Sequence, residues 1–451
     1  MKKKLDANII IKEFFITNLY EERDIVITFD SPYRILVAEN GYGKTTILNS
    51  FYALLSGNTS KLRKIKFDKI GIKFSDGDEV GFNKEEFNSD LLISEDDFFL
   101  KYVERELGQD VVLELLAELR QNSSHRMHLL PTYQYIEESL DLPQDTMRDS
   151  LRGVLRSIRQ NDDKVKARTR HKIDNIKNKL KLKTLYLPTY RRVEEDIRAF
   201  SRLRTKNSSS HNTINFGIAD VKENIDKITS EILQSSAESF LRINGQILSQ
   251  LIDGFTISSD MRDSVSDPKS VRIVLDRIGK SFSDENKQQV LDMIKNKSIY
   301  HDQNNALLYF VSSLLEVYKK QQENDEAIKN FSYYCNKYLV DKKIDYDESS
   351  VTVSINRKKS GKPVEFESLS SGEKQIISLF SILYLQKKDN LAIFFDEPEL
   401  SLSMEWQKTL LPDIIDSGKC KFLFATTHSP FIFENELQKN TVDLSEYIKE
   451  L

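Results

Sequence analysis

A short run near the N-terminus combines glycines, a lysine and two threonines at a spacing that suits phosphate binding. Residues 38–46, AENGYGKTT, fit the pattern GxxxxGK[ST], with Ala38 in place of the first glycine. Backbone N–H groups of such a loop wrap phosphate oxygens at a helix N-terminus, and the lysine neutralises them. Alanine suits the first position if its φ angle is negative, whereas glycine reaches positive φ at little cost. The predicted phosphate-binding residues are Asn40, Gly41, Gly43, Lys44, Thr45 and Thr46.

Two carboxylates follow the apolar run LAIFF near the other end of the chain. Such a run is typical of a buried parallel strand, which delivers its last residues to the carboxyl edge of a sheet, where α/β proteins bind ligands. We expect Asp396 and the Thr45 hydroxyl to hold a metal ion, and Glu397 to polarise an attacking water as general base. Taken alone, Asp-Glu after a strand is more often structural than catalytic.

A third apolar run, KFLFATT, ends just before His428. A lone histidine at such a place is more often structural. In combination with the two preceding motifs, however, we interpret His428 as a second catalytic residue, which senses the terminal phosphate or the attacking water.

The segment Leu369-Ser-Ser-Gly-Glu-Lys-Gln375 opens a predicted helix just upstream of the Asp-Glu strand. A Ser-Ser-Gly start would by itself be a plain helix cap. Four motifs follow one another in a fixed order: the P-loop, LSSGEKQ, the strand ending in DEPEL, and TTHSP. In this order they resemble the motifs of the ATP-binding cassette head of the SMC, RecF and OLD-like ATPases. The resemblance covers about residues 8–57 and 349–435, roughly a third of the chain.

This resemblance implies that ATP and Mg²⁺ are the cofactors and that two heads clamp two ATP molecules, in a homodimer or a higher homo-oligomer. By position, Ser370, Ser371, Gly372 and Glu373 would then belong to the nucleotide site, with Ser370 and Gly372 on the γ-phosphate of the partner head. Residues 400–403 would couple the two sites, although Ser403 stands where many relatives have histidine. The metal-contacting glutamine of the family has only candidates by order, Gln134 and Gln160.

The elements around these motifs predict an α/β fold, an ABC-type P-loop ATPase head with a large, mainly helical insertion. Residues 8–57 indicate three strands, a glycine-rich loop and a helix, and residues 65–82 indicate a hairpin. After the insertion, VTVSIN and VEFESL indicate strands, followed by a helix, the strand LAIFFDE, a helix around MEWQKTLLPDII and the strand KFLFATT.

Helical patterns dominate the middle of the chain. Residues 84–183 are first acidic and then basic, and apolar spacings on both sides of QNDD at 160–163 favour a helical hairpin. Residues 148–206 carry 19 lysines and arginines against 7 acidic residues, although the whole chain has a net charge of −4. We predict five parts: 1–83, 84–183, 184–220 with a return strand and an Arg-rich loop, 221–348, and 349–451.

Length and composition limit the class of protein. The 451 residues are 39% hydrophobic and 30% charged with 15 glycines, which excludes collagen-like, low-complexity and mostly disordered chains. We expect no signal peptide or membrane span, and Cys335 and Cys420 favour a reducing compartment, so the predicted location is the cytoplasm.

Two functions remain open from the sequence. The insertion is too short for SMC arms, and LYLPTYRRVEE and FGIADVKENI resemble ATPase subunits of antiphage systems, PARIS-type more than Septu-type. That resemblance implies a phage-encoded trigger and a separate effector nuclease, of TOPRIM type or less closely HNH type, because only 23 residues follow His428. The alternative is a RecF-like ATPase in repair or DNA bridging that contacts DNA through residues 148–206.

Overall fold

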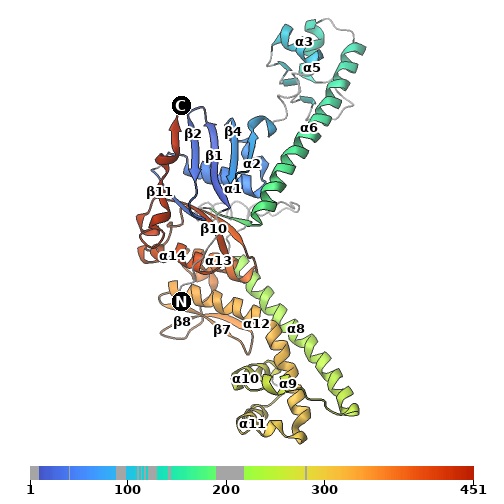
Figure 1. The fold of residues 1–451 in the computed structure, drawn as a ribbon, viewed down its shortest axis with the longest axis vertical. Coiled ribbons are helices and arrows are strands. Elements are labelled where there is room, and N and C mark those ends of the chain that lie inside the picture. The colour runs from blue at the N-terminus through green and yellow to red at the C-terminus, as the bar shows by residue number, and fades with distance from the viewer. Residues whose placement is uncertain are drawn as a thin grey trace. The chain divides into compact units, whose positions relative to one another are not determined.

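In the computed structural model, the chain folds into two compact units (Figure 1). The first contains residues 1–187, 390–398 and 420–451, and the second contains residues 188–389 and 399–419. The structure describes residues 10–39, 41–87, 98–108, 111–112, 114–115, 118–119, 130–140, 144–188, 218–279 and 282–451.

The first unit contains two five-stranded sheets. One is antiparallel with the order β12-β2-β1-β4-β5, and it includes the predicted hairpin as β4 and β5. The other is parallel with the order β11-β3-β10-β9-β6. The strand bounds are β1 Ile11–Leu19, β2 Arg23–Thr28, β3 Tyr33–Val37, β4 Lys69–Phe74, β5 Glu79–Asn83, β6 Lys183–Leu187, β9 Leu391–Asp396, β10 Cys420–Thr427, β11 Thr441–Asp443 and β12 Ile448–Glu450.

Helix α1, Lys44–Ser56, contacts side chains of both sheets. Its Phe51 is fully buried and stacks on Phe14 of β1, with 4.3 Å between ring centroids. The same ring meets Phe394 of β9 and Phe424 of β10 edge to face. Aromatic pairs of this kind add about 0.5–1.5 kcal/mol each beyond the area they bury. The P-loop helix is therefore fixed from two sides by the core.

Helix α6, Gln144–Leu180, is one continuous helix of 37 residues, so the predicted helical hairpin is wrong. The QNDD stretch contains neither glycine nor proline, and Asn and Asp cost a helix only about 0.7 kcal/mol each or less. Near the end of α6, Ile173 and Ile176 pack into the core of the two sheets. Near its start, Leu151 and Val154 pack into a second apolar cluster with α3, Phe98–Leu107, and α5, Pro131–Leu140. The first unit also contains α2, Thr59–Arg63, and the short helix η1, Lys84–Glu86.

Long helices form most of the second unit. Helix α12 contacts α8, α13, α9 and α10, and it leads directly into the hairpin of β7 and β8. The bounds are α8 Ile218–Asp253, α9 Ser259–Ser264, α10 Pro268–Arg277, α11 Asp284–Lys295, α12 Asn305–Tyr338, β7 Lys342–Asp347, β8 Thr352–Arg357, α13 Ser371–Leu385 and α14 Met404–Asp416.

The segment VEFESL does not form the predicted strand. Only Pro363, just before it, makes a bridge, to Asn356 of β8, and residues Phe366–Ser368 form a 3₁₀ turn. The Val364 N–H still donates to the Ile355 carbonyl oxygen at 2.8 Å, but the 3₁₀ turn that follows leads the chain into the cap of α13, so the ladder stops there.

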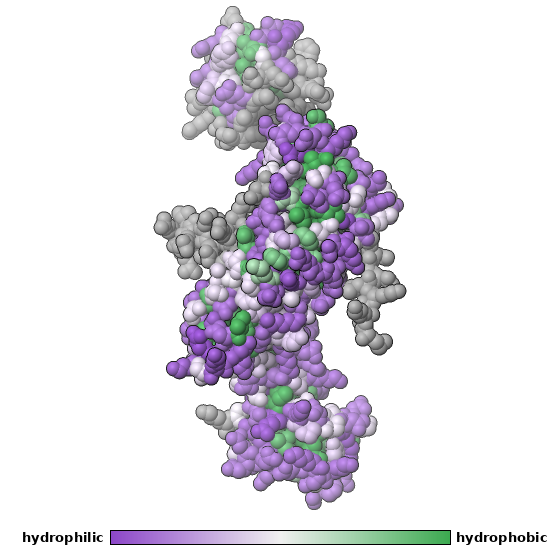
Figure 2. Space-filling model, turned by 90° about the vertical axis from the view of Figure 1, so that its left-hand side faces the viewer, coloured by the Kyte–Doolittle hydropathy of each residue, from purple (hydrophilic) through white to green (hydrophobic). Residues whose placement is uncertain are grey.

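No helix among the described residues is long and apolar enough to cross a membrane. The face of the molecule in Figure 2 is mainly hydrophilic, with small separate apolar areas. Of the basic stretch 148–206, residues 189–206 lie outside the described residues.

Candidate functional site

Three strands of the parallel sheet end side by side at one edge. In the register of the sheet, Thr426 of β10 lies beside Asp396 of β9, and Thr427 lies beside Val37 of β3. The residues that follow these strands are the P-loop, Glu397 and His428. Because both pairings run parallel, the carboxyl ends of the three strands meet at the same place, as a ligand site of an α/β sheet requires.

The P-loop backbone has the geometry that its glycines permit. Gly41 and Gly43 have φ angles of 95° and 80°, and Gly43 directly precedes the first residue of α1. Ala38 does not have a positive φ, so no glycine is needed at that position. Asn40 lies outside the described residues. The N-terminus of α1 therefore presents N–H groups and its partial positive charge next to Thr45 and Thr46.

The Lys44 side chain is buried and bound within the site. Its ammonium donates to the carbonyl oxygen of Ala38 at 2.6 Å. It also contacts both ring nitrogens of His428, at 3.1 Å for Nδ1 and closer for Nε2. The contact joins the P-loop lysine to the histidine that follows β10.

Asp396 is the buried carboxylate of the site, with an exposed fraction of 2%. Its Oδ1 accepts from the Thr426 hydroxyl at 2.9 Å and from the Thr45 hydroxyl at 3.4 Å. One carboxylate and one hydroxyl are the small set of protein oxygens that Mg²⁺ uses when phosphates and water fill its other positions. Thr45 and Asp396 therefore fit the predicted magnesium site.

Glu397 has an unusual backbone at the end of β9. Its φ angle is 49°, which costs a residue other than glycine about 1–3 kcal/mol, and its N–H donates to the Thr426 carbonyl oxygen at 2.9 Å. The side chain is a quarter exposed, and its Oε1 lies 3.7 Å from Nε2 of His428. The turn thus places the two predicted catalytic side chains together at the solvent border of the site.

The LSSGEKQ segment, here named the signature segment, begins α13 in the second unit with a complete capping box. Ser370 Oγ accepts from the Glu373 N–H at 3.3 Å, and Glu373 Oε2 accepts from the Ser370 N–H at 2.8 Å. Lys342 of β7 donates to both oxygens of Glu373, at 2.9 and 3.2 Å. Ser370 and Ser371 are exposed, while Glu373 is buried, so the Glu373 carboxylate supports the cap from behind.

Gly372 is required by packing. A Cβ atom on this residue would lie 2.4 Å from the Ser401 carbonyl oxygen and 3.3 Å from the Trp406 ring. Ser401 belongs to the predicted coupling loop 400–403, whose Leu402 carbonyl accepts from Gln407 at 3.0 Å. Ser403 is exposed and precedes α14. The first turn of the signature helix therefore lies directly against the coupling loop.

Two further residues bind predicted site residues, one in each unit, although the motifs did not single them out. Thr426 binds Asp396 from the neighbouring strand, and Lys342 binds Glu373 from β7. Thr426 lies within the TTHSP motif, whereas Lys342 lies far from any motif. Of the two glutamine candidates, Gln134 lies exposed on α5, and Gln160 lies on α6 with its side chain outside the described residues.

Comparison with known proteins gives one family. The model of the AAA ATPase domain matches residues 10–433. No curated protein matches the chain. Among solved structures, the chain is similar to an Smc head domain with an extended coiled coil, bound to the C-terminal domain of ScpA, from Pyrococcus furiosus. The identity is 12%, 98% of this chain and 96% of that chain are covered, and the TM-score is 0.35. It is also similar to an Smc head domain with a coiled coil and joint from Pyrococcus yayanosii, at 13% identity, 98% and 97% coverage and a TM-score of 0.32.

Proposed function

Because the chain belongs to the AAA ATPase domain family, we propose that it hydrolyses ATP with Glu397 as general base, and that two copies must meet for rapid turnover. The observation that carries the proposal is the meeting of Lys44, Asp396, Glu397 and His428 at one sheet edge. A phosphate-binding lysine and a metal-binding carboxylate would bind nucleotide, and a second, partly exposed carboxylate beside a histidine is what water activation needs.

In the proposed reaction, the N–H groups at the start of α1 and the Lys44 ammonium bind the β- and γ-phosphates. Mg²⁺, held by Thr45 and Asp396, would supply charge neutralisation of the phosphate oxygens. Glu397 accepts a proton from water as the water oxygen bonds to the γ-phosphorus, and the bond from that phosphorus to the β–γ bridging oxygen breaks. Before this attack, Lys44 exchanges its contact with His428 for one with phosphate, and His428 orients the water or the γ-phosphate.

The signature segment supports the need for a second copy. Ser370 and Ser371 are exposed hydroxyls at the positive end of a 15-residue helix, which is a surface that complements a phosphate. We propose that Ser370 and Gly372 contact the γ-phosphate of ATP bound to another copy, in a homodimer or higher homo-oligomer. Ser371 and Glu373 would belong to the same nucleotide site.

We further propose that the ATP-dependent assembly senses a phage product in the cytoplasm and holds or releases a separate nuclease, of TOPRIM type or, less closely, HNH type. Support comes from the sequence motifs LYLPTYRRVEE and FGIADVKENI, which lie partly outside the described residues. The five-part division of the chain likewise stays a prediction. The alternative, a RecF-like ATPase in DNA repair or bridging, draws support from the basic stretch 148–206.

Light scattering after gel filtration tests the assembly. With ATP and Mg²⁺, we expect the Glu397→Gln protein to form a dimer, because it binds ATP and cannot hydrolyse it. Lys44→Ala should stay monomeric, and so should Ser370→Arg, which keeps the P-loop but blocks the proposed phosphate contact. A dimer that forms equally in all three variants, or without ATP, would contradict the proposal.

Mass spectrometry of proteins that co-purify with tagged Glu397→Gln protein, after nuclease treatment to remove bridging DNA, tests the finer role. A nuclease in fixed ratio supports effector control. Recovery of repair proteins, or of none once DNA is digested, favours the DNA-bound alternative.

A further inference from the structure

The second unit contains a pocket that lies among α8, α10 and α12. Its volume is about 250 Å³, and apolar side chains form most of its wall. The polar part of the wall comes from Arg277, Tyr318, Gln321, Ser236 and Ser239, and none of the described residues that line the pocket is a carboxylate. A mainly apolar cavity with a few convergent polar groups is the usual form of a small-molecule site.

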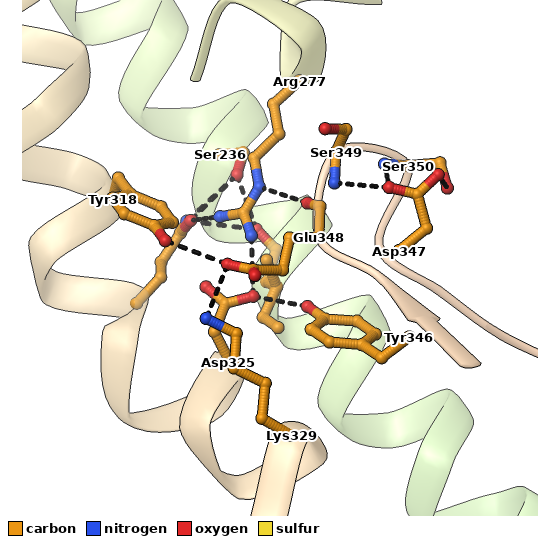
Figure 3. Close-up of polar contacts among 12 residues, drawn as sticks. Ser236, Arg277, Tyr318, Asp325, Lys329, Tyr346, Asp347, Glu348, Ser349 and Ser350 are labelled. Carbon is orange, nitrogen blue, oxygen red and sulfur yellow. Dashed lines mark hydrogen bonds and ion pairs between the residues drawn. The ribbon is translucent and has the colours of Figure 1, made fainter. Parts of the chain in front are cut away.

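Arg277, at the end of α10, is the one charged residue among the described residues that line this wall. Its side chain is 93% buried, since the exposed fraction is 7%. Three of its N–H groups are used: Nε donates to the Glu348 carbonyl oxygen at 2.9 Å, Nη1 to Gln321 at 2.9 Å, and Nη2 to Asp325 at 2.7 Å (Figure 3). Arginine has five N–H donors, so two have no partner among the described residues.

The surrounding side chains fix Arg277 in position. Asp325 on α12 also accepts from the Tyr346 hydroxyl, and the Tyr318 ring lies 5.1 Å from the guanidinium carbon (Figure 3). The Glu348 carboxylate is bound by Tyr318 and Lys329. The charges of Arg277, Lys329, Asp325 and Glu348 cancel, so the network needs no counter-ion. Arg277 lines the pocket, so its two remaining N–H groups are the donors that an oxygen acceptor in the pocket could use.

We propose that this pocket binds a small molecule that has an apolar body and a hydrogen-bond-accepting oxygen, which contacts Arg277. The acceptor is a carboxylate or a neutral carbonyl, since both chemistries fit the donors. A cationic head does not fit, because it would meet a buried guanidinium. This pocket shares no residue with the nucleotide site, and the proposal does not depend on the function proposed above.

Three eight-carbon probes distinguish the head groups on the full chain. Octanoate, octanamide and octylammonium share the apolar body and differ only in the head. By titration calorimetry, we expect octanoate or octanamide to bind at least about 10-fold more tightly than octylammonium, as expected for one hydrogen bond to a charged donor. Binding of octanamide but not octanoate would show that the head group of the ligand is neutral. Binding of octanoate but not octanamide would show that it is anionic.

Variants on α8 locate the binding. Ala237 is exposed and lines the pocket, so Ala237→Phe fills the pocket without altering the Arg277 network. Ser235 is exposed on the same helix and does not line the pocket, so Ser235→Phe is the matched control. We expect the first variant to weaken binding at least about 10-fold and the second to leave it within about 2-fold.

Arg277 itself is not replaced, because Asp325 would then be buried without its cation and the variant would be prone to unfold. The proposal is overturned if no probe binds below about 10 mM, a limit near 3 kcal/mol. It is also overturned if octylammonium binds as well as the others, or if Ala237→Phe binds as the wild type does.

Discussion

The P-loop site and the signature segment differ in what their polar groups contact. In the first unit, Lys44 and Asp396 are buried and bound to other residues of the same site. In the second unit, Ser370 and Ser371 are exposed, and only their supports, Glu373 and Lys342, are buried or nearly so. The first set is joined by contacts within one unit, whereas the second is a solvent-facing helix cap. This difference suggests that binding and turnover are separable by substitution.

The largest effect should come from the general base. Glu397→Gln keeps the shape of the side chain and removes its ability to accept a proton, so we expect phosphate release to fall by about 10²–10⁴-fold. ATP affinity, measured by equilibrium binding, should be unchanged, since Lys44 and Asp396 remain. Equal turnover in the variant and the wild type would refute the assignment.

Lys44→Ala should act on binding itself. Loss of hydrogen bonds from a charged donor costs about 1.5–3 kcal/mol, so ATP affinity should fall by about 10- to 150-fold. Lys64→Ala is the control, because Lys64 is an exposed lysine of the same unit. If both variants bind ATP equally, Lys44 does not contact phosphate.

Gly372→Ala should destabilise the second unit by about 2–3 kcal/mol, because its Cβ would collide with the Ser401 carbonyl oxygen. Trp406, the one tryptophan in the sequence, lies beside Gly372 and reports unfolding in urea by its fluorescence. Gly245→Ala, on a helix with open space around it, should instead stabilise by about 0.5–1 kcal/mol. Destabilisation of both variants would show that the contact with Ser401 is not the cause.

The smallest effect concerns the support of the cap. Burial opposes the charge on Lys342, but the hydrogen bonds that its ammonium donates to Glu373 and Asp341 outweigh burial and raise the pKa of Lys342 above its ordinary value of 10.5. The pair therefore stabilises the fold at neutral pH and loses its effect as pH rises through the raised pKa. Lys342→Met should cost about 1.5 kcal/mol at pH 7 and less above pH 10.5, by urea unfolding. Lys343→Met, which removes an exposed pair, should cost little at either pH.

The sequence predicted the first unit better than the second. The family match and the parallel sheet confirm an α/β P-loop ATPase fold with large helical segments. Phosphate chemistry permits few residue types at fixed spacing, so the motifs alone were enough to assign Lys44, Asp396 and His428 to one site. The contact between Lys44 and His428 itself had no local signal, since 384 residues separate the two.

The middle of the chain was harder to predict because its sequence patterns indicate where single helices begin and end, but not how the helices pack. Asp267 caps the start of α10 and is followed by Pro268, and Ser283 caps the start of α11. These residue types are typical of helix starts, so both starts could have been recognised from the sequence. The pairing of Arg277 with Asp325 depends on how the helices pack, which the sequence pattern does not reveal. The sequence predicts a break within α6 because the polar QNDD stretch interrupts the apolar spacing, but polar residues alone do not end a helix.

Helix α6 can transmit motion as a lever. Its 37 residues span about 55 Å, and it carries one apolar cluster near its start and inserts its end into the core of the sheets. A tilt of about 10° at the sheet end would displace the far end by about 10 Å. A tilt too small to alter the packing around Ile173 and Ile176 would thus produce a large displacement of the apolar cluster around Leu151.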